Sequence, residues 1–416
     1  MTAVVNKISA PHRHFHQLFS KNTDAYNISF MNGLAGATLV SAHLGRALSA
    51  DMGAVAGAEM KQMSKVLHDR LLGRLQRGDL KITSLHSLCS GLAGVIYVLD
   101  ELKREGFSEH SLERATRDSL TELLLKQSLQ DFDQRNTDFL HGPLGVFFVL
   151  LKDMHHAPTK EALDQIFDRY QEQLVTDHLG SRIYNSVLEG QREADEYNFG
   201  LAHGMSGHIA LWTEAHARGF RPQETEQLVT RLLQYIDHYR VEPGAVATKG
   251  SHKYYPKSVI ENNEEAWKEI KEETYNSRLG WCYGDINIAF AKIKAGKVFG
   301  RQDWWNDGLN LARHVATRLD PADAQISTNA FFCHGAAGLV YMFGLLHQAT
   351  GENLFLTARK NYAEYYKELW QLPKYTDLKL HRPASFLDGI PGAVLGTLSE
   401  IPGGGYPLAD AFLLKI

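Results

Sequence analysis

Short apolar runs alternate with longer segments of mixed polarity along most of this chain. The apolar runs are hydrophobic on nearly every side, which is typical of helices buried all round. They include residues 37–40, 95–99, 146–151 and 339–343. The longer segments place apolar residues on one helical face and charged residues on the other. They include residues 111–126, 159–175, 223–239 and 353–370, with Thr159 as an expected N-cap. The pattern therefore predicts buried helices that alternate with half-exposed ones.

A glycine turn precedes each apolar run. Six copies hold a glycine pair: Gly33/Gly36, Gly91/Gly94, Gly142/Gly145, Gly204/Gly207, Gly335/Gly338 and Gly389/Gly392. A seventh copy has Gly284 with Asn287 in the second place, and most intervals are about 50 to 60 residues. The repeats predict an all-α, seven-repeat (α/α) toroid of two concentric helix rings, formed as a single domain by residues 1–416. An open superhelical solenoid is the alternative, but no repeat has the composition of a cap.

One interval, between Gly207 and Gly284, is longer than the others. The extra residues, 241–277, contain the patch Lys253–Lys257 and an acidic run around 261–273. We interpret them as an insertion between repeats four and five. It is either a solvated surface loop with one helix or a flap that contacts a peptide, since basic and aromatic side chains suit an extended segment.

Bulk composition excludes several function classes. The net charge of −4 and the pI near 6.6 give no general case for nucleic-acid binding. No apolar run reaches the roughly 18 residues that span a bilayer, so at most a peripheral membrane association is expected. Three cysteines are too few for a disulfide framework, and we expect a reducing cytoplasm.

Two glycine turns carry metal-binding side chains. Cys282 precedes Tyr283-Gly284, and Cys333-His334 precedes Gly335, so both groups occupy matching positions of neighbouring repeats. Two thiolates and one imidazole are zinc ligands, and a three-ligand set leaves the fourth position open. Such a site, with one Zn²⁺, would activate a substrate thiol better than a water. The alternative is that both cysteines pack as small hydrophobic residues.

Other polar residues lie in the same register. His203 directly precedes Gly204, and Asp138 and Arg278 come shortly before Gly142 and Gly284. A carboxylate that fixes an imidazole tautomer would make His203 and Asp138 an acid/base pair. Tyr283 could protonate or hydrogen-bond a developing enolate. Equally, Asp138 could cap a helix, Arg278 could pair with the acidic run, and His203 could be a core residue. His208, after the repeat-four turn, has no evident role.

These motifs resemble the lanthionine synthetase C-like family, and most of all the stand-alone cyclases of class I lanthipeptide biosynthesis. The resemblance rests on Ala202-His203-Gly204, Trp281-Cys282-Tyr283-Gly284 and Cys333-His334-Gly335 in this order, and it covers nearly the whole chain. It implies a seven-repeat toroid with one catalytic zinc held by Cys282, Cys333 and His334. It also implies that His203 is the acid/base residue, with Asp138, Arg278 and Tyr283 as catalytic companions.

The resemblance implies an activity and partners as well. Enzymes of this type add a peptide cysteine to dehydroalanine or dehydrobutyrine and so form lanthionine or methyllanthionine rings. The expected partners are a dehydrated precursor peptide, with its leader and core, together with a dehydratase and a transporter. The alternative function is a zinc- or glutathione-binding relative that does not cyclise peptides.

Two other enzyme classes fit the sequence less well. A protein prenyltransferase pairs Asp and Cys one residue apart in its zinc site, and that spacing is absent here. A barrel glycosidase needs two carboxylates at its centre, for which Asp138 and Asp285 are the candidates. That class would leave the two cysteine motifs unexplained.

Overall fold

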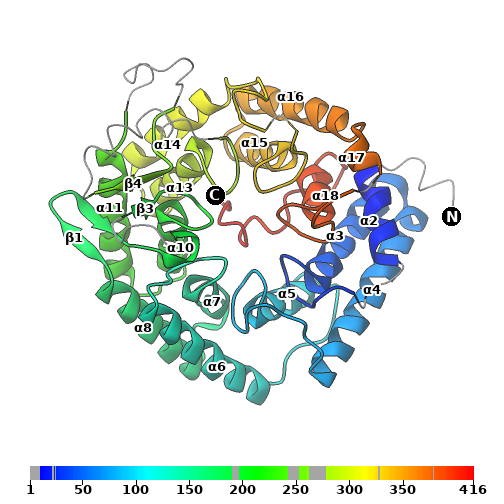
Figure 1. The fold of residues 1–416 in the computed structure, drawn as a ribbon, viewed down its shortest axis with the longest axis horizontal. Helices are drawn as coiled ribbons and strands as arrows, with labels where there is room; N and C mark the ends of the chain where they lie inside the picture. The colour runs from blue at the N-terminus through cyan, green and yellow to red at the C-terminus, as the bar shows by residue number, and fades with distance from the viewer. Residues whose placement is uncertain are drawn as a thin grey trace. The chain divides into compact units, whose positions relative to one another are not determined.

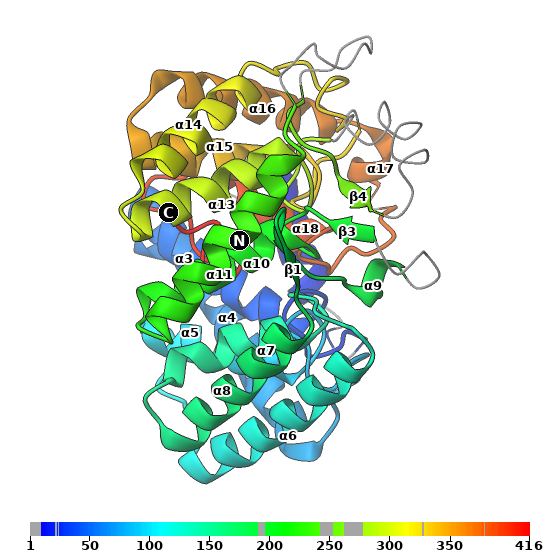
Figure 2. The ribbon, with the colours of Figure 1, turned by 90° about the vertical axis from the view of Figure 1, so that its left-hand side faces the viewer.

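The computed structural model describes residues 10–20, 23, 25–189, 196–241, 253–261, 278–326, 328–377 and 379–416. By packing, the chain divides into two compact units. Unit 1 comprises Met1–Arg114 and Thr328–Leu408, and unit 2 comprises Ala115–Ser327 and Ala409–Ile416. Both units are built mainly of helices (Figures 1 and 2). Among the described residues, no helix is long and apolar enough to cross a membrane.

Within its described residues, unit 1 contains four helices that each begin at a glycine turn and have mostly buried side chains. They are α3 (Leu34–Met52), α5 (Leu92–Arg104), α15 (Ala336–Thr350) and α18 (Ile390–Leu398). The other helices of the unit are α2 (Ala10–Ser20), α4 (Ala54–Arg77), α16 (Asn353–Leu369) and α17 (Pro373–Thr376). Helix α4 packs on α3, α16 on α15 and α2 on α18, so the N-terminal helix pairs with the last glycine-turn helix (Figure 1).

Unit 2 repeats this arrangement with three further glycine-turn helices. They are α7 (Pro143–Leu150), α10 (Met205–Ala217) and α13 (Asp285–Val298). The other helical segments are α6 (Arg114–Asp133), η1 (Leu151–Asp153), α8 (Ala157–Glu172), α9 (Ser186–Glu189), α11 (Pro222–His238) and α14 (Gln302–Val315). Helix α8 packs on α7, α11 on α10 and α14 on α13, while α10 contacts both α7 and α13.

Two short antiparallel sheets complete unit 2. Strand β1 (Val175–Asp177) pairs with β2 (Gly180–Arg182), and β3 (Glu196–Asn198) pairs with β4 (Ser258–Ile260). The β3–β4 register places Tyr197 opposite Val259. Both sheets lie on the same side of helices α10 and α11 (Figure 2). The second sheet joins the segment before His203 to residues 253–261, the described part of the predicted insertion; residues 242–252 and 262–277 lie outside the described residues.

The glycine pairs have a steric reason. A Cβ atom on Gly207 would lie 2.0 Å from the carbonyl oxygen of Leu201, and one on Gly338 would lie 2.0 Å from that of Phe332. The second glycine of each pair therefore makes room for the loop that leads into its own helix. The fifth copy differs because Gly284 has a φ of 117°, while Asn287 is already helical. Positive φ at Gly284, which a side chain would disfavour, lets this turn form without a second glycine.

The predicted helix faces are confirmed in part. In α11 the side chains of Leu228, Leu232 and Ile236 are buried, as expected. The predicted cap Thr159 is wrong: α8 begins at Ala157 with Pro158 in its first turn, and Thr159 is a buried helical residue. Segment 111–126 is also displaced, because α6 begins at Arg114 and buries Thr121, Leu124, Ser128 and Phe132. Two of these four buried residues are polar, so the leucine pattern alone did not define this face.

An ion pair joins α10 and α13, two neighbouring glycine-turn helices of unit 2. Glu214 on α10 lies 3.0 Å from Nζ of Lys294 on α13; the Lys294 side chain is buried, and that of Glu214 is 12% exposed. Burial alone would raise the pKa of Glu214, but the charges of Lys294 and Arg218 lower it to about 2. Burial lowers the pKa of Lys294, and Glu214 opposes that effect.

We expect Glu214→Gln to destabilise the protein by about 3 kcal/mol, because Lys294 would keep a buried charge without its carboxylate. Because the folded pKa of Glu214 is depressed, its contribution is complete above about pH 4.5 and is lost as the pH falls to about 2. Urea unfolding at several pH values checks this expectation. Glu172→Gln, at an exposed pair with Arg169, is the control and should change stability by less than about 0.5 kcal/mol. Equal effects of the two substitutions would contradict the prediction.

Candidate metal and acid/base site

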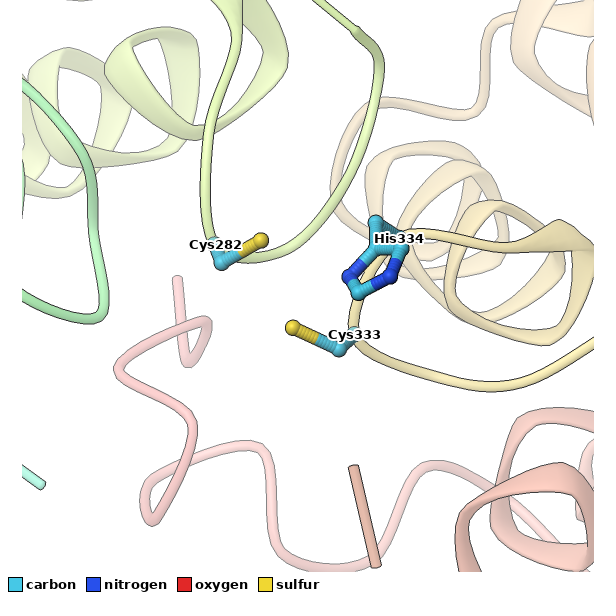
Figure 3. Close-up of side chains that lie close together, drawn as sticks. All are labelled: Cys282, Cys333 and His334. Carbon is cyan, nitrogen blue, oxygen red and sulfur yellow. The ribbon is translucent and has the colours of Figure 1, made fainter. Parts of the chain in front are cut away.

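Cys282, Cys333 and His334 form the candidate metal group. One ligand atom from each residue lies within 4.8 Å of the other two, and the two sulfur atoms and the imidazole face a common space (Figure 3). Both cysteine side chains are buried, and that of His334 is 30% exposed. Within the part of the chain that the structure describes, the group has no fourth histidine, cysteine or carboxylate member.

This donor set fits zinc. Tetrahedral zinc has bonds of about 2.3 Å to sulfur and about 2.0 Å to nitrogen, so its ligand atoms lie roughly 4 Å apart. The observed spacing needs only small side-chain movements to reach that geometry. Two sulfurs and one imidazole are also soft and borderline donors. Such donors suit zinc, whereas magnesium and calcium prefer oxygen ligands. A carboxylate oxygen of Asp388 lies 3.8 Å from Nε2 of His334, near enough to influence the ring's orientation.

The loop that carries Cys282 is fixed from two sides in unit 2. Its carbonyl oxygen accepts a hydrogen bond of 3.0 Å from the backbone N–H of Leu201, in the loop before α10. The indole N–H of Trp281 donates to the carbonyl oxygen of Phe412, 2.8 Å away, and the two rings pack edge to face. The C-terminal residues therefore support the backbone that presents Cys282.

Gly200 permits the close approach of the two loops. A Cβ atom there would lie 2.5 Å from the carbonyl oxygen of Cys282 and 2.8 Å from the Tyr283 ring. We therefore expect Gly200→Ala to displace the Cys282 loop, with about 1–3 kcal/mol of destabilisation and at least a roughly tenfold loss of zinc affinity. Competition with a chromophoric chelator measures the affinity.

Gly73→Ala is the matched control for this substitution. Gly73 lies within α4, where the closest atom to an added Cβ is the end of the Arg77 side chain at 3.3 Å. Alanine favours a helix over glycine, so zinc affinity should stay unchanged and stability should not fall. If Gly200→Ala bound zinc as tightly as this control, the proposed crowding would not control the ligand loop.

His203 and Asp138 form the hydrogen-bonded pair that the sequence suggested. Nδ1 of His203 lies 2.7 Å from Oδ2 of Asp138, whose side chain is fully buried. Burial alone would lower the pKa of His203, but the charge and hydrogen bond of Asp138 raise it. Burial alone would raise the pKa of Asp138, yet the charge of His203 and its hydrogen bonds hold it at about 2. The carboxylate thus stays ionised and fixes Nδ1, so this contact does not involve Nε2.

Asp138 also hydrogen-bonds the backbone just before α7, which is close to the capping role given as the alternative in the sequence analysis. Its Oδ1 accepts a 2.7 Å hydrogen bond from the backbone N–H of His141, which stabilises the turn before α7. Asn185 donates both to Oδ2 of Asp138 and to the backbone oxygen of His203, at 2.8 and 2.9 Å. Asp138 therefore stabilises its own turn and orients His203 at the same time.

Sequence reasoning missed two members of this cluster, His141 and Asn185. The His141 ring is parallel to that of His203, with an interplanar angle of 8° and centroids 5.8 Å apart. A signal was present, because His141 precedes Gly142 in the same way that His203 precedes Gly204 and His334 precedes Gly335. Asn185 had no such signal, since it lies in a long loop outside the repeat pattern.

The remaining candidate residues have distinct environments. The Tyr283 hydroxyl oxygen accepts a hydrogen bond of 2.9 Å from Nδ2 of Asn198. Arg278 is exposed, and within the described residues no hydrogen bond or ion pair of its side chain is present; most of the acidic run lies outside that part of the chain. His208 is buried against Tyr170, and burial lowers its pKa to about 4, so it is a neutral core residue.

The fold and these motifs identify the class of protein. Residues 24–404 match the family model of the lanthionine synthetase C-like proteins, and the chain belongs to this family. It is 20% identical over 327 residues to the nisin biosynthesis protein NisC of Lactococcus lactis subsp. lactis, a match that covers 74% of this chain and 72% of the relative.

A solved structure of nisin cyclase has the same fold. It matches with a TM-score of 0.68 at 16% identity, over 97% of this chain and 96% of the other. The predicted fold class, an all-α (α/α) toroid, is thereby confirmed. The predicted division into one domain with an insertion at 241–277 stays a prediction.

Proposed function

We propose that this protein is a zinc-dependent lanthipeptide cyclase that adds peptide cysteine thiols to dehydroalanine or dehydrobutyrine and so forms thioether rings. The observation that carries the proposal is the group of Cys282, Cys333 and His334 with its three ligand atoms within 4.8 Å. Membership of the lanthionine synthetase C-like family and the likeness to nisin cyclase support it. The substrate would be a dehydrated precursor peptide, and a dehydratase and a transporter are the expected partners.

Cys282, Cys333 and His334 would hold the zinc ion. When bound, zinc would supply an open coordination position and lower the pKa of a substrate thiol, so that its sulfur is a thiolate near neutral pH. The two cysteine ligands keep the site electron-rich, which preserves the nucleophilic character of an incoming sulfur.

The acid/base steps would fall to His203 and Tyr283. The sulfur forms a bond to the β-carbon of the dehydro residue, and the double-bond electrons move to the α-carbon and its amide oxygen. Tyr283 or Arg278 would donate a hydrogen bond to that oxygen. His203 would accept the thiol proton at Nε2 and return a proton to the α-carbon, while Asp138 stabilises the imidazolium. The addition is balanced, since one S–H and one C=C become one C–S and one C–H.

Tyr283 is suitably arranged for such a hydrogen bond. Asn198 donates to its oxygen, so the hydroxyl's own hydrogen is directed to another acceptor. This favours Tyr283 as a donor to the developing oxyanion. The buried carboxylate of Asp285 argues against a glycosidase, because it is occupied by the backbone N–H groups of Tyr254 and Tyr255.

Two measurements on the purified full chain test the proposal. Elemental analysis should give about one zinc per chain, as the three-ligand site requires. Incubation with a dehydrated peptide, followed by thiol alkylation and mass spectrometry, should show that alkylatable thiols disappear without a change in peptide mass. If zinc is present but every thiol stays alkylatable, the protein is a metal- or thiol-binding relative and the cyclase proposal is wrong.

A further inference from the structure

Residues 253–261 are held against the elements next to the loops that carry His203 and Tyr283. The buried Asp285, the first residue of α13, accepts hydrogen bonds from the backbone N–H groups of Tyr254 and Tyr255 at 2.9 and 3.2 Å. Strand β4 pairs with β3, and the hydroxyl of Ser258 donates to Glu196 at 2.7 Å. This segment is therefore attached both to the helix after the Cys282 loop and to the strand before the His203 loop.

Within this segment, Lys257 places its positive charge over the ring of Tyr283. The backbone oxygen of Lys257 accepts a 2.9 Å hydrogen bond from Phe199, which fixes this residue's position. Its side chain is exposed, and Nζ lies 5.0 Å from the centre of the Tyr283 ring. Among the described residues, Lys257 has no carboxylate partner, and its contact with the ring is a cation–π interaction. An ammonium has three N–H donors, and a cation–π contact does not occupy all of them.

We propose that Lys257 is a substrate-binding residue whose ammonium donates to a backbone carbonyl oxygen of the peptide near the reacting dehydro residue. This inference rests on the proposed cyclase function. The ammonium lies over the face of the Tyr283 ring, whereas the hydroxyl at the ring edge is the donor to the reacting amide. In an extended peptide the carbonyl groups that point to one side belong to alternate residues and lie about 6.6–6.8 Å apart, so the two donors suit the reacting amide and the carbonyl group two residues away.

The position of the ammonium determines which kinetic constant changes. A hydrogen bond to this second carbonyl is present both before and during the reaction, so it strengthens binding without lowering the barrier. We expect Lys257→Met to raise the KM for a dehydrated peptide about tenfold, with kcat within about threefold of the wild type. Lys257→Arg, which keeps a donor that can also stack on the ring, should restore KM to within about threefold.

Controls separate this inference from the cyclase proposal and from folding. Lys297→Met replaces an exposed lysine at the far end of α13 and should leave both constants unchanged. Zinc content should be normal in all variants. If the wild type forms no rings, the cyclase proposal fails. If the wild type is active and Lys257→Met has an unchanged KM, the role of Lys257 is refuted.

A second peptide identifies the group that Lys257 contacts. The same kinetics are measured with a dehydrated peptide that contains no aspartate or glutamate and has an amidated C-terminus. A carbonyl contact predicts the same rise of KM for Lys257→Met. If the effect disappears with this peptide, Lys257 binds an acidic side chain and the carbonyl assignment is wrong.

Discussion

Cys282→Ala should lose both the bound zinc and ring formation. The substitution removes one of three protein ligands, and the two that remain, Cys333 and His334, are adjacent in sequence on one loop. A change in the groups that only orient a ligand weakens metal binding by about 10- to 100-fold, and loss of a ligand should exceed this. We expect zinc per chain to fall to background in elemental analysis and thiol consumption in the peptide assay to become undetectable.

Cys89→Ala is the matched control. Cys89 is also a buried cysteine, but its sulfur contacts Asn32 and it is not a member of the metal group. Its replacement removes one buried sulfur, with an expected cost of about 1 kcal/mol and no loss of zinc. A Cys282→Ala protein that kept its full zinc content would disprove the assigned ligand set. Unfolding curves of both variants exclude a general loss of structure as the cause.

His203→Ala should separate chemistry from metal binding. His203 is not in the metal group, so zinc content should be the same as in the wild type. A positioned acid/base side chain contributes about 10²- to 10⁴-fold to rate, and we expect kcat to fall by that amount. Asp138→Asn should have a smaller effect, because it keeps a hydrogen-bonding side chain near Nδ1 but removes the buried charge that stabilises the imidazolium. Single-turnover alkylation assays measure both.

The exposed His178 provides the control for His203. His178→Ala removes an imidazole from the turn between β1 and β2 and should leave the rate unchanged. If His203→Ala closed rings at the wild-type rate, His203 would be structural, and the Asp138 pair would serve only to hold the loop before α10. If the His203→Ala protein lost its zinc, His203 would contribute to metal binding and its assignment as an acid/base residue alone would be wrong.

The helical repeats could be predicted because they depend on near neighbours in the chain. A glycine turn followed by a mostly apolar run marks the start of a buried helix, and all seven turns, including the one at Gly284 without a second glycine, begin a helix in the structure. Helix ends were less predictable. The start of α8 had a local signal that was overlooked, because Pro158 lies in its first turn. The buried face of α6 includes Thr121 and Ser128, which a pattern of apolar residues does not indicate.

The candidate site also contains residues that could be predicted from the sequence and residues that could not. Repeat register places Cys282, Cys333, His334 and His203 at equivalent turns. The same register also contains Cys89, which is not in the metal group, and His141, which was overlooked, so register alone did not define the cluster. Asn185 could not be found, since its contact with Asp138 joins positions 47 residues apart with no shared motif.

The sequence by itself determined that this protein is an all-helical repeat array with cysteine and histidine side chains at several of its glycine turns. Those properties follow from spacing along the chain, where each residue's neighbours are fixed by covalent bonds. Only the tertiary structure decided that Asn185 orients Asp138, that Asp285 anchors Tyr254 and Tyr255, and that Lys257 lies over Tyr283. These contacts join loops that are distant in sequence, and their geometry is set by the packing of the helices between them.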